Sequence, residues 1–220
     1  TYYRWGQNSD VVIRMPTGGG SAAGPFHSQS NEAWFFHVAG LRIVYPSTPS
    51  DAKGLLLAAF EDPNPVLFFE HKGLYRSIKE EVHTAEYTIE IGKANVLMQG
   101  DDITFITYGL GVQWCTEVIE DQSISATLVD LRTLLPWDKD TVREAVKTTG
   151  KVIVVHEDTQ EGGIGGEVAA WIGEHCFTSL DAPVMRVGSL DTPIPFNADL
   201  EINFMGKSRL EGKVNELLEW

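Results

Sequence analysis

The amino-acid sequence predicts an α/β protein of two domains that divide near residue 85. A strand–helix–strand pattern occupies the first half, and a longer alternation of strands and helices occupies the second. Between them, residues 76–90 are charged and irregular, as a linker is. We therefore expect one domain over residues 1–85 and another over residues 86–220.

The first domain is expected to contain a βαβ unit. An apolar strand over residues 11–15 should stop at Pro16, and strands over 41–45 and 65–69 flank a helix. Thr48 is placed to cap that helix, with Pro49 in its first position. Its apolar positions, spaced i, i+3, i+4, i+7 and i+8 as one buried face requires, are Ala52, Leu55, Leu56, Ala59 and Phe60. Three strands without an N-terminal neighbour suggest that this domain lacks its front part.

The second domain is expected to be a self-contained α/β sandwich. Strands are predicted over residues 103–108, 127–131, 151–156 and 184–187, and helices over 112–121, 141–148, 165–177 and 208–219. Thr141 and Glu144 have the spacing of a capping box.

The composition limits the kinds of partner that this protein can bind. The 220 residues carry a net charge of −14 and no basic stripe, which argues against nucleic acid and anionic membranes. The acidity fits either plain solubility or a basic protein partner. Cys115 and Cys176 fall on apolar helix faces and are expected to be buried thiols in a reducing compartment; an exported protein with one long-range disulfide is the less favoured alternative. We therefore expect a cytoplasmic protein.

Several polar segments are candidate sites. The glycine-rich loop over residues 18–24 suits an anion, but a flexible turn that lets the backbone approach a neighbour is favoured. His27 follows this loop, where a histidine could transfer protons to a ligand, but a histidine that simply faces solvent is favoured on these grounds. His156, Glu157 and Asp158 alternate in direction along a strand, so they cannot all bind one metal.

The segment after the first predicted helix could hold a hard cation. Asp62 and Asn64 could add side-chain oxygens to the unpaired carbonyls at the end of that helix. An ordinary helix end and turn explains the same residues and is slightly favoured on these grounds.

Several sequence runs resemble the β subunits of thiamine-diphosphate-dependent 2-oxo acid dehydrogenases, in order along nearly the whole chain. The most specific are Phe-His-Ser-Gln-Ser-Asn-Glu-Ala-Trp at 26–34 and Phe-Glu-His-Lys-Gly-Leu-Tyr-Arg at 69–76. Others are Glu-Asp-Pro-Asn-Pro at 61–65, Asp-Leu-Arg-Thr-Leu-Leu-Pro-Trp-Asp at 130–138, His-Glu at 156–157 and Asp-Thr-Pro at 191–193. The branched-chain members are the most similar, and pyruvate dehydrogenase is second.

This resemblance implies the rear part of a pyrimidine-binding domain followed by a transketolase C-terminal-type domain. Thiamine diphosphate and magnesium would be shared with an α subunit or a fused α half. A branched 2-oxo acid would be decarboxylated, and the acyl group passed to lipoyl-lysine of an acyltransferase. The cofactor would supply the organic chemistry and the protein its orientation and electrostatics.

The resemblance also implies residue roles and partners. His27 matches the β-subunit histidine that supports acylation of the lipoyl group. Val11, Ala59, Phe60, Asp62 and Asn64 match a structural potassium site. A second β chain would form a dimer interface, and the basic subunit-binding domain of the acyltransferase would dock on the C-terminal domain.

The sequence departs from the family pattern in several places. The glutamate and aromatic that contact the aminopyrimidine would lie before Thr1, and no Gly-Asp-Gly…Asn motif for the metal diphosphate is present. Relatives often carry histidine near Phe196. We therefore expect this piece alone not to bind the cofactor and to be inactive. A pyruvate dehydrogenase β subunit, a non-catalytic dimerisation or docking module, and another transketolase-type enzyme remain the alternatives.

Overall fold

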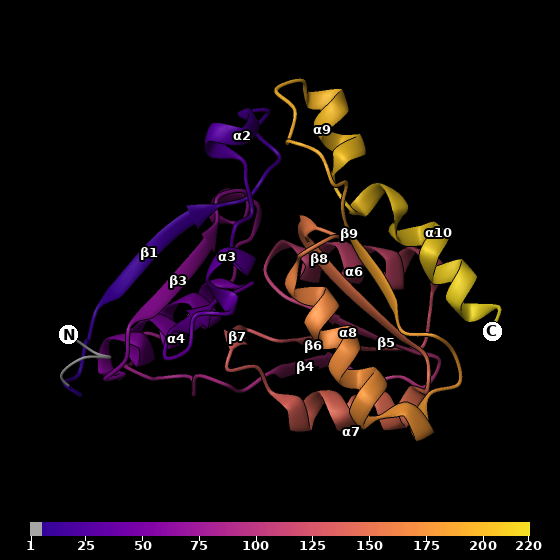
Figure 1. Cartoon of the computed structure of the whole chain (residues 1–220), viewed down its shortest axis with the longest axis horizontal. Coiled ribbons are helices and arrows are strands. Elements are labelled where there is room, and N and C mark those ends of the chain that lie inside the picture. Colours follow the sequence, from indigo (N-terminus) through magenta and orange to yellow (C-terminus); the bar gives the residue numbers. More distant parts are fainter. Residues whose placement is uncertain (1–5) are drawn as a thin grey trace.

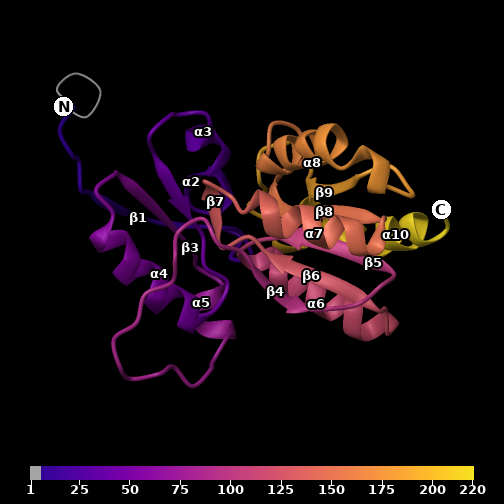
Figure 2. The same cartoon turned by 90° about the horizontal axis from the view of Figure 1, so that it is seen from below.

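The computed structural model describes residues 6–220, which form two α/β lobes side by side (Figure 1). Residues 1–5 of the predicted first domain lie outside the described residues. Residues 78–94 connect the lobes without helix or strand and run below the first lobe in Figure 2. The exact boundary at residue 85 stays a prediction.

The first lobe is built on a four-stranded sheet with the order β1-β3-β2-β7. Its strands are β1 (Val12–Thr17), β2 (Arg42–Val44), β3 (Val66–His71) and β7 (Thr133–Leu135), and its helices are α2 (Gly24–His27), α3 (Ala33–Phe36), α4 (Pro49–Glu61) and α5 (Leu74–Ser77). Strands β1 and β2 both pair in parallel with the fully buried β3. The predicted βαβ unit is thus present, with Val66 and Phe68 facing α4 and Leu67 and Phe69 facing the second lobe.

The second lobe has a five-stranded sheet with the order β4-β6-β5-β8-β9, in which only the β4–β6 pair is antiparallel. Its elements are β4 (Asn95–Met98), β5 (Ile103–Thr107), α6 (Leu110–Gln122), β6 (Ala126–Asp130), α7 (Lys139–Thr149), β8 (Val152–Thr159), α8 (Ile164–His175), η1 (Phe177–Ser179), β9 (Met185–Ser189), α9 (Ala198–Phe204) and α10 (Lys207–Leu218). Helices α7 and α8 cover one face, and α6 and α10 cover the other. Parallel strands buried on both faces explain the continuous apolar runs in this half.

Local signals explain most of the boundaries. The Thr48 side chain accepts a hydrogen bond from Asp51 N at 3.2 Å and caps α4 as predicted. Helix α7 instead begins at Lys139, two residues earlier than expected, because Asp138, not Thr141, is its N-cap and accepts from Thr141 N. Strand β1 continues through Pro16, because an edge strand can place a residue without an N–H on its unpaired side.

Strand β7 links the two lobes. It lies between β6 and α7 of the second half of the chain, yet it pairs antiparallel with β2 of the first lobe. Next to it, Arg132 Nη2 lies 2.7 Å from Asp51 Oδ1, and Ser47 Oγ donates to Asp130 Oδ2 at 2.5 Å. The expectation of a self-contained second half is therefore wrong, because one of its strands completes the other sheet.

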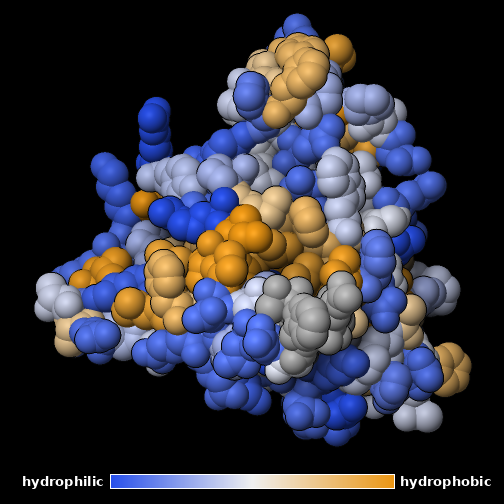
Figure 3. Space-filling view, turned by 60° about the vertical axis from the view of Figure 1, so that its left-hand side comes forward, coloured by the Kyte–Doolittle hydropathy of each residue, from blue (hydrophilic) through white to orange (hydrophobic). Residues whose placement is uncertain are grey.

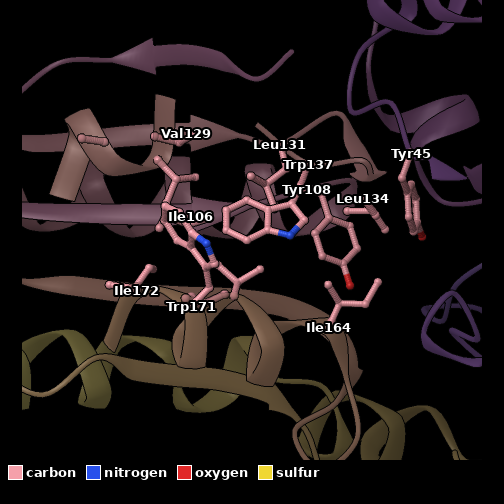
Figure 4. Close-up of a cluster of buried hydrophobic side chains, with 14 of the residues drawn as sticks. Tyr45, Ile106, Tyr108, Val129, Leu131, Leu134, Trp137, Ile164, Trp171 and Ile172 are labelled. Carbon is pink, nitrogen blue, oxygen red and sulfur yellow. The ribbon is translucent and has the colours of Figure 1, made fainter. Parts of the chain in front are cut away.

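The largest core cluster also crosses between the lobes. Ile43, Tyr45, Leu67 and Phe69 of the first sheet belong to the same cluster as the side chains beneath α7 and α8. Figure 4 shows Tyr45 at one end of this cluster and two tryptophans in its interior. These are Trp137 and Trp171, whose rings meet edge to face with centroids 5.0 Å apart, a geometry that adds about 0.5–1.5 kcal/mol to their burial.

Both cysteines are buried and free, as predicted, with Cys115 in α6 and Cys176 directly after α8. The predicted apolar face of α4 is correct for Leu55 and Ala59 but not for Phe60, whose side chain is exposed because it turns away from the sheet. No helix within residues 6–220 is long and apolar enough to cross a membrane.

Candidate functional site

A polar pocket opens between the lobes, where the carboxyl ends of their parallel strands come close together. It has a volume of about 190 Å³. The lining residues come from the run at 28–30, the end of β8, the run at 192–194 and helices α3 and α9, and they are Ser28, Gln29, Ser30, Trp34, Glu157, Asp158, Thr159, Thr192, Pro193, Ile194 and Phe204. The crevice beyond the carboxyl ends of strands is the usual ligand position in open α/β sheets.

His27 ends the short helix α2 beside this pocket, and its side chain is exposed. It does not line the pocket itself, although its neighbour Ser28 does. Beside His27, the ring centroids of Phe26 and Phe196 are 6.2 Å apart. The segment around Phe196, where the sequence departs from the family pattern, therefore lies next to this histidine. In Figure 1, α2 and the turn before α9 face each other at the top of the gap between the lobes.

The glycine-rich loop before α2 permits close packing, as the favoured interpretation expects. Gly18 has φ +94°, and a Cβ there would lie 2.1 Å from the His71 ring. Its neighbour Gly19 donates from N to Glu157 Oε1 at 2.6 Å, and Ala22 N donates to Glu201 Oε2 at 2.7 Å. The amides that could have held a phosphate therefore hold carboxylates of the second lobe.

Glu157 is the centre of a buried hydrogen-bond network. It accepts from Gly19 N, from Ser30 Oγ at 3.2 Å and from His71 Nε2 at 2.6 Å. Because His71 Nδ1 accepts from Gly73 N, the ring nitrogen that donates to the carboxylate is Nε2. Burial opposes ionisation of Glu157, but the adjacent His71 and the hydrogen bonds outweigh it and hold the pKa of this carboxyl below its usual value.

A second buried carboxyl has the opposite character. Glu32, before α3, is fully buried; Tyr108 donates to its Oε1 at 2.8 Å, and its Oε2 has no hydrogen-bond partner among the described residues. Burial, reinforced by nearby Asp158, raises the pKa of Glu32 to about 8. Burial also raises the pKa of Asp158 to about 6. This pair spans the two lobes, and it retains a proton at neutral pH.

His156, on the other side of β8, has a structural role. Burial lowers the pKa of its imidazole to about 4, so the ring is neutral at physiological pH. Its Nδ1 lies 3.0 Å from the Asp158 carbonyl, and the ring packs against Gly163 and Gly165. Across the described residues, no three His, Cys, Asp or Glu side chains are grouped as a metal site.

The five residues of the predicted potassium site lie around the C-terminal end of α4 and the start of β1. Asp62 Oδ1 accepts from Asn64 N at 2.8 Å and from Asn64 Nδ2, and Asp62 Oδ2 lies 3.5 Å from Arg42 Nε. The Val11 carbonyl accepts from Val66 N. Ala59 and Phe60 are in the last turn of the helix, so their carbonyls point toward its end. Oxygen atoms that could bind a cation therefore lie close together here, but both side-chain oxygens of Asp62 already have protein partners.

Comparison with known proteins defines the class to which this fold belongs. The transketolase pyrimidine-binding domain family matches residues 2–78, and the transketolase C-terminal domain family matches residues 92–208. A solved structure described as a split-gene transketolase, inactive β4 tetramer, superposes with a TM-score of 0.75 at 25% identity, covering 96% of this chain and 67% of that one.

Individual relatives are more specific. The 2-oxoisovalerate dehydrogenase subunit beta of Bacillus subtilis is 50% identical over 99% of the chain and 69% of its own length. The mitochondrial 2-oxoisovalerate dehydrogenase subunit beta 2 of Arabidopsis thaliana is 47% identical over 84% of this chain and 52% of its own length. The pyruvate dehydrogenase E1 component subunit beta of B. subtilis is 46% identical over 88% of this chain and 60% of its own length.

The chain belongs to the β-subunit family of thiamine-diphosphate-dependent 2-oxo acid dehydrogenases. This confirms the family resemblance and the fold class, and the higher identity lies with the branched-chain members. The chain spans between about half and about two thirds of the length of these relatives.

The pocket between the lobes does not fit the diphosphate of the family cofactor. Its lining includes Glu157 and Asp158 and neither lysine nor arginine, so a diphosphate would be repelled there. Groups that could grip a diphosphate therefore do not line this pocket.

Sequence reasoning missed the roles of Glu32, Tyr108, His71 and Glu201. Each reaches a partner at least 76 residues away in the chain or on the other lobe. Glu157 alone had a local signal. It follows a run of buried strand residues near the carboxyl end of β8, where ligand-binding side chains of α/β proteins usually lie.

Proposed function

We propose that the chain is part of the β subunit of the decarboxylating component of a 2-oxo acid dehydrogenase complex. The observation that carries this proposal is the pocket between the lobes, where the Ser-Gln-Ser run at 28–30 and the Thr-Pro run at 192–193 line one space. These runs are far apart in sequence, and both belong to the family resemblance. The substrate is a branched 2-oxo acid, in agreement with the higher identity to 2-oxoisovalerate dehydrogenase chains.

In this proposal thiamine diphosphate, when bound, supplies the carbon nucleophile and the electron sink for decarboxylation. An α subunit or fused α half grips the diphosphate with magnesium, in keeping with the acidic pocket of this chain. His27 has an exposed imidazole beside the pocket and exchanges a proton during transfer of the acyl group to lipoyl-lysine.

The surface of the first lobe supports a partner chain. Apolar residues gather on the side of this lobe that comes forward in Figure 3. Strand β1 is an edge of its sheet, and Ile13 on this strand and Val11 just before it are about half exposed. An exposed apolar edge of this kind needs another polypeptide to cover it. We assign it to contact within an α–β assembly that also contains a second β chain.

The remaining assignments follow from the same proposal. A potassium ion held by Val11, Ala59, Phe60, Asp62 and Asn64 would stiffen the end of α4 beside β1. The acidic second lobe, with a whole-chain charge of −14, suits docking of a basic subunit-binding domain of the lipoyl acyltransferase. The cytoplasm, or the mitochondrial matrix in a eukaryote, is the matching compartment.

The test uses the full-length β subunit assembled with its α partner. Turnover of 2-oxoisovalerate should exceed turnover of pyruvate. His27→Ala should lower acylation of a lipoyl domain by about 100-fold or more, since proton transfer by a positioned side chain contributes about 10²–10⁴. The exposed His37 lies outside the pocket, and His37→Ala serves as the control.

Two outcomes would contradict the proposal. Acylation by His27→Ala at the parent rate would remove the role of His27, and preference for pyruvate would favour the pyruvate dehydrogenase assignment. A non-catalytic docking module is tested separately, by titrating the protein with a basic subunit-binding domain at low and high salt. Binding without any turnover of either 2-oxo acid would favour that module.

A further inference from the structure

His27 lies on a closed loop whose two ends meet. At the neck of the loop, Thr17 Oγ1 donates to the Gln29 carbonyl at 2.7 Å, and Gly18 N donates to the same carbonyl at 3.3 Å. Residues 18–30 therefore leave and re-enter the first lobe at one point. The position of His27 depends on whatever fixes this neck.

Glu157 of the second lobe binds both sides of the neck. One of its oxygens, Oε1, accepts from Gly19 N where the loop begins and from Ser30 Oγ where it ends. The other oxygen, Oε2, accepts from His71 at the end of β3. Only 7% of Glu157 is exposed, so water competes little for these three donors.

A second carboxylate holds the middle of the loop. Glu201, in α9, is 3% exposed and accepts from Ala22 N at 2.7 Å. Ala22 has φ +52°, a left-handed conformation that a residue with a Cβ adopts only when its surroundings impose it. The loop is thus attached to the second lobe at two places, and His27 follows the second attachment by five residues.

We propose that Glu157 is a positioning residue for His27, through which the second lobe sets where the histidine lies. This inference rests on the proposed function, in which His27 serves lipoyl acylation. Glutamine cannot replace the carboxylate, because its amide nitrogen would face one of the three donors. His71 cannot adapt by moving its proton to Nδ1, since Nδ1 is already an acceptor for Gly73 N.

The experiment compares Glu157→Gln with the parent in the full-length β subunit assembled with its α partner. Decarboxylation is followed with an artificial electron acceptor, and acylation with a free lipoyl domain. Glu157→Gln should lower kcat for acylation by about 10- to 100-fold, because misplacement of a catalytic group by about 1 Å costs up to about 100-fold. The loss in acylation should exceed any loss in decarboxylation, and KM for the lipoyl domain should stay within about twofold. Glu161→Gln, an exposed glutamate four residues on, is the matched control.

The double variant His27→Ala/Glu157→Gln separates positioning from an independent effect. If Glu157 acts through His27, the double variant should acylate no more slowly than His27→Ala alone. Amide hydrogen exchange of residues 18–30 should also be at least 10-fold faster in Glu157→Gln than in Glu161→Gln.

Failure of this inference can be told apart from failure of the proposed function. Full acylation by His27→Ala would overturn the proposed role of His27, and with it the positioning role of Glu157. Impaired His27→Ala with an unimpaired Glu157→Gln, or multiplicative losses in the double variant, would overturn only the inference. If Glu157→Gln does not assemble, Ser30→Ala removes one donor and leaves the carboxylate intact. It should lower acylation about threefold, and a parent-like rate would then refute the positioning role.

Discussion

Replacing Glu32 with glutamine should stabilise the protein at neutral pH and flatten the dependence of its stability on pH. Burial, together with nearby Asp158, raises the pKa of Glu32 from 4.5 to about 8. The folded state therefore binds a proton that the unfolded state releases between these two values. Stability from this group is full below about pH 4.5 and is lost as the pH rises toward about 8.

The size of the effect follows from linkage. One pKa unit corresponds to about 1.4 kcal/mol, so a single group with this shift lowers the free energy of unfolding by roughly 2–3 kcal/mol between about pH 5 and 7. For a chain of this length that amounts to roughly 5–10 °C in Tm. Glutamine keeps an oxygen for the Tyr108 hydroxyl and resembles the protonated acid, so Glu32→Gln should escape this loss.

Thermal unfolding from pH 5 to 8 measures this difference, with the exposed Glu86→Gln as a control. The Tm of Glu32→Gln should match the parent near pH 5 and exceed it at pH 7 and above. Parallel curves for parent and Glu32→Gln across this range would refute the reasoning, because Glu32 would then have an ordinary pKa in the folded state.

Two further predictions concern the cation site and the thiols. If potassium binds at the end of α4, exchanging it for lithium should lower Tm by a few degrees, and Asp62→Ala should abolish that difference; an ion effect that persists in Asp62→Ala would exclude this site. Burial raises the pKa of the Cys115 thiol well above its usual range, so a disulfide-exchange reagent at pH 8 should label it only as the protein opens. Rapid stoichiometric labelling of the folded protein would contradict that burial.

Helix α4 could be predicted from local sequence signals alone. The cap at Thr48 and the apolar spacing of Leu55 and Ala59 specify α4 without reference to the rest of the chain. The cap of α7 was misplaced because Asp138 and Thr141 are both good caps, and the hydroxyl of Thr141 in fact donates to Asp138 at 2.8 Å. Strand β7 is only three residues long, too short for any periodicity to show.

The site was less accessible to sequence reasoning. His27 was found through the family resemblance, whereas its position in a loop carries no chemical signal of its own. Glu157 and His71 are separated by 86 residues, and nothing near either residue indicates the other. The pKa of Glu32 depends on complete burial and on Asp158, which only the packed lobes create.

The strand β7 makes the two lobes interlocked rather than merely adjacent. A protease that cuts the connecting residues 78–94 would leave two pieces still joined through the β2–β7 pair and through the ion pair of Asp51 with Arg132. Neither piece could fold to completion alone, since one would lack an edge strand and the other would expose Leu134, which is fully buried here. Unfolding of one lobe therefore perturbs the other, and the pocket between them forms only when both lobes are folded.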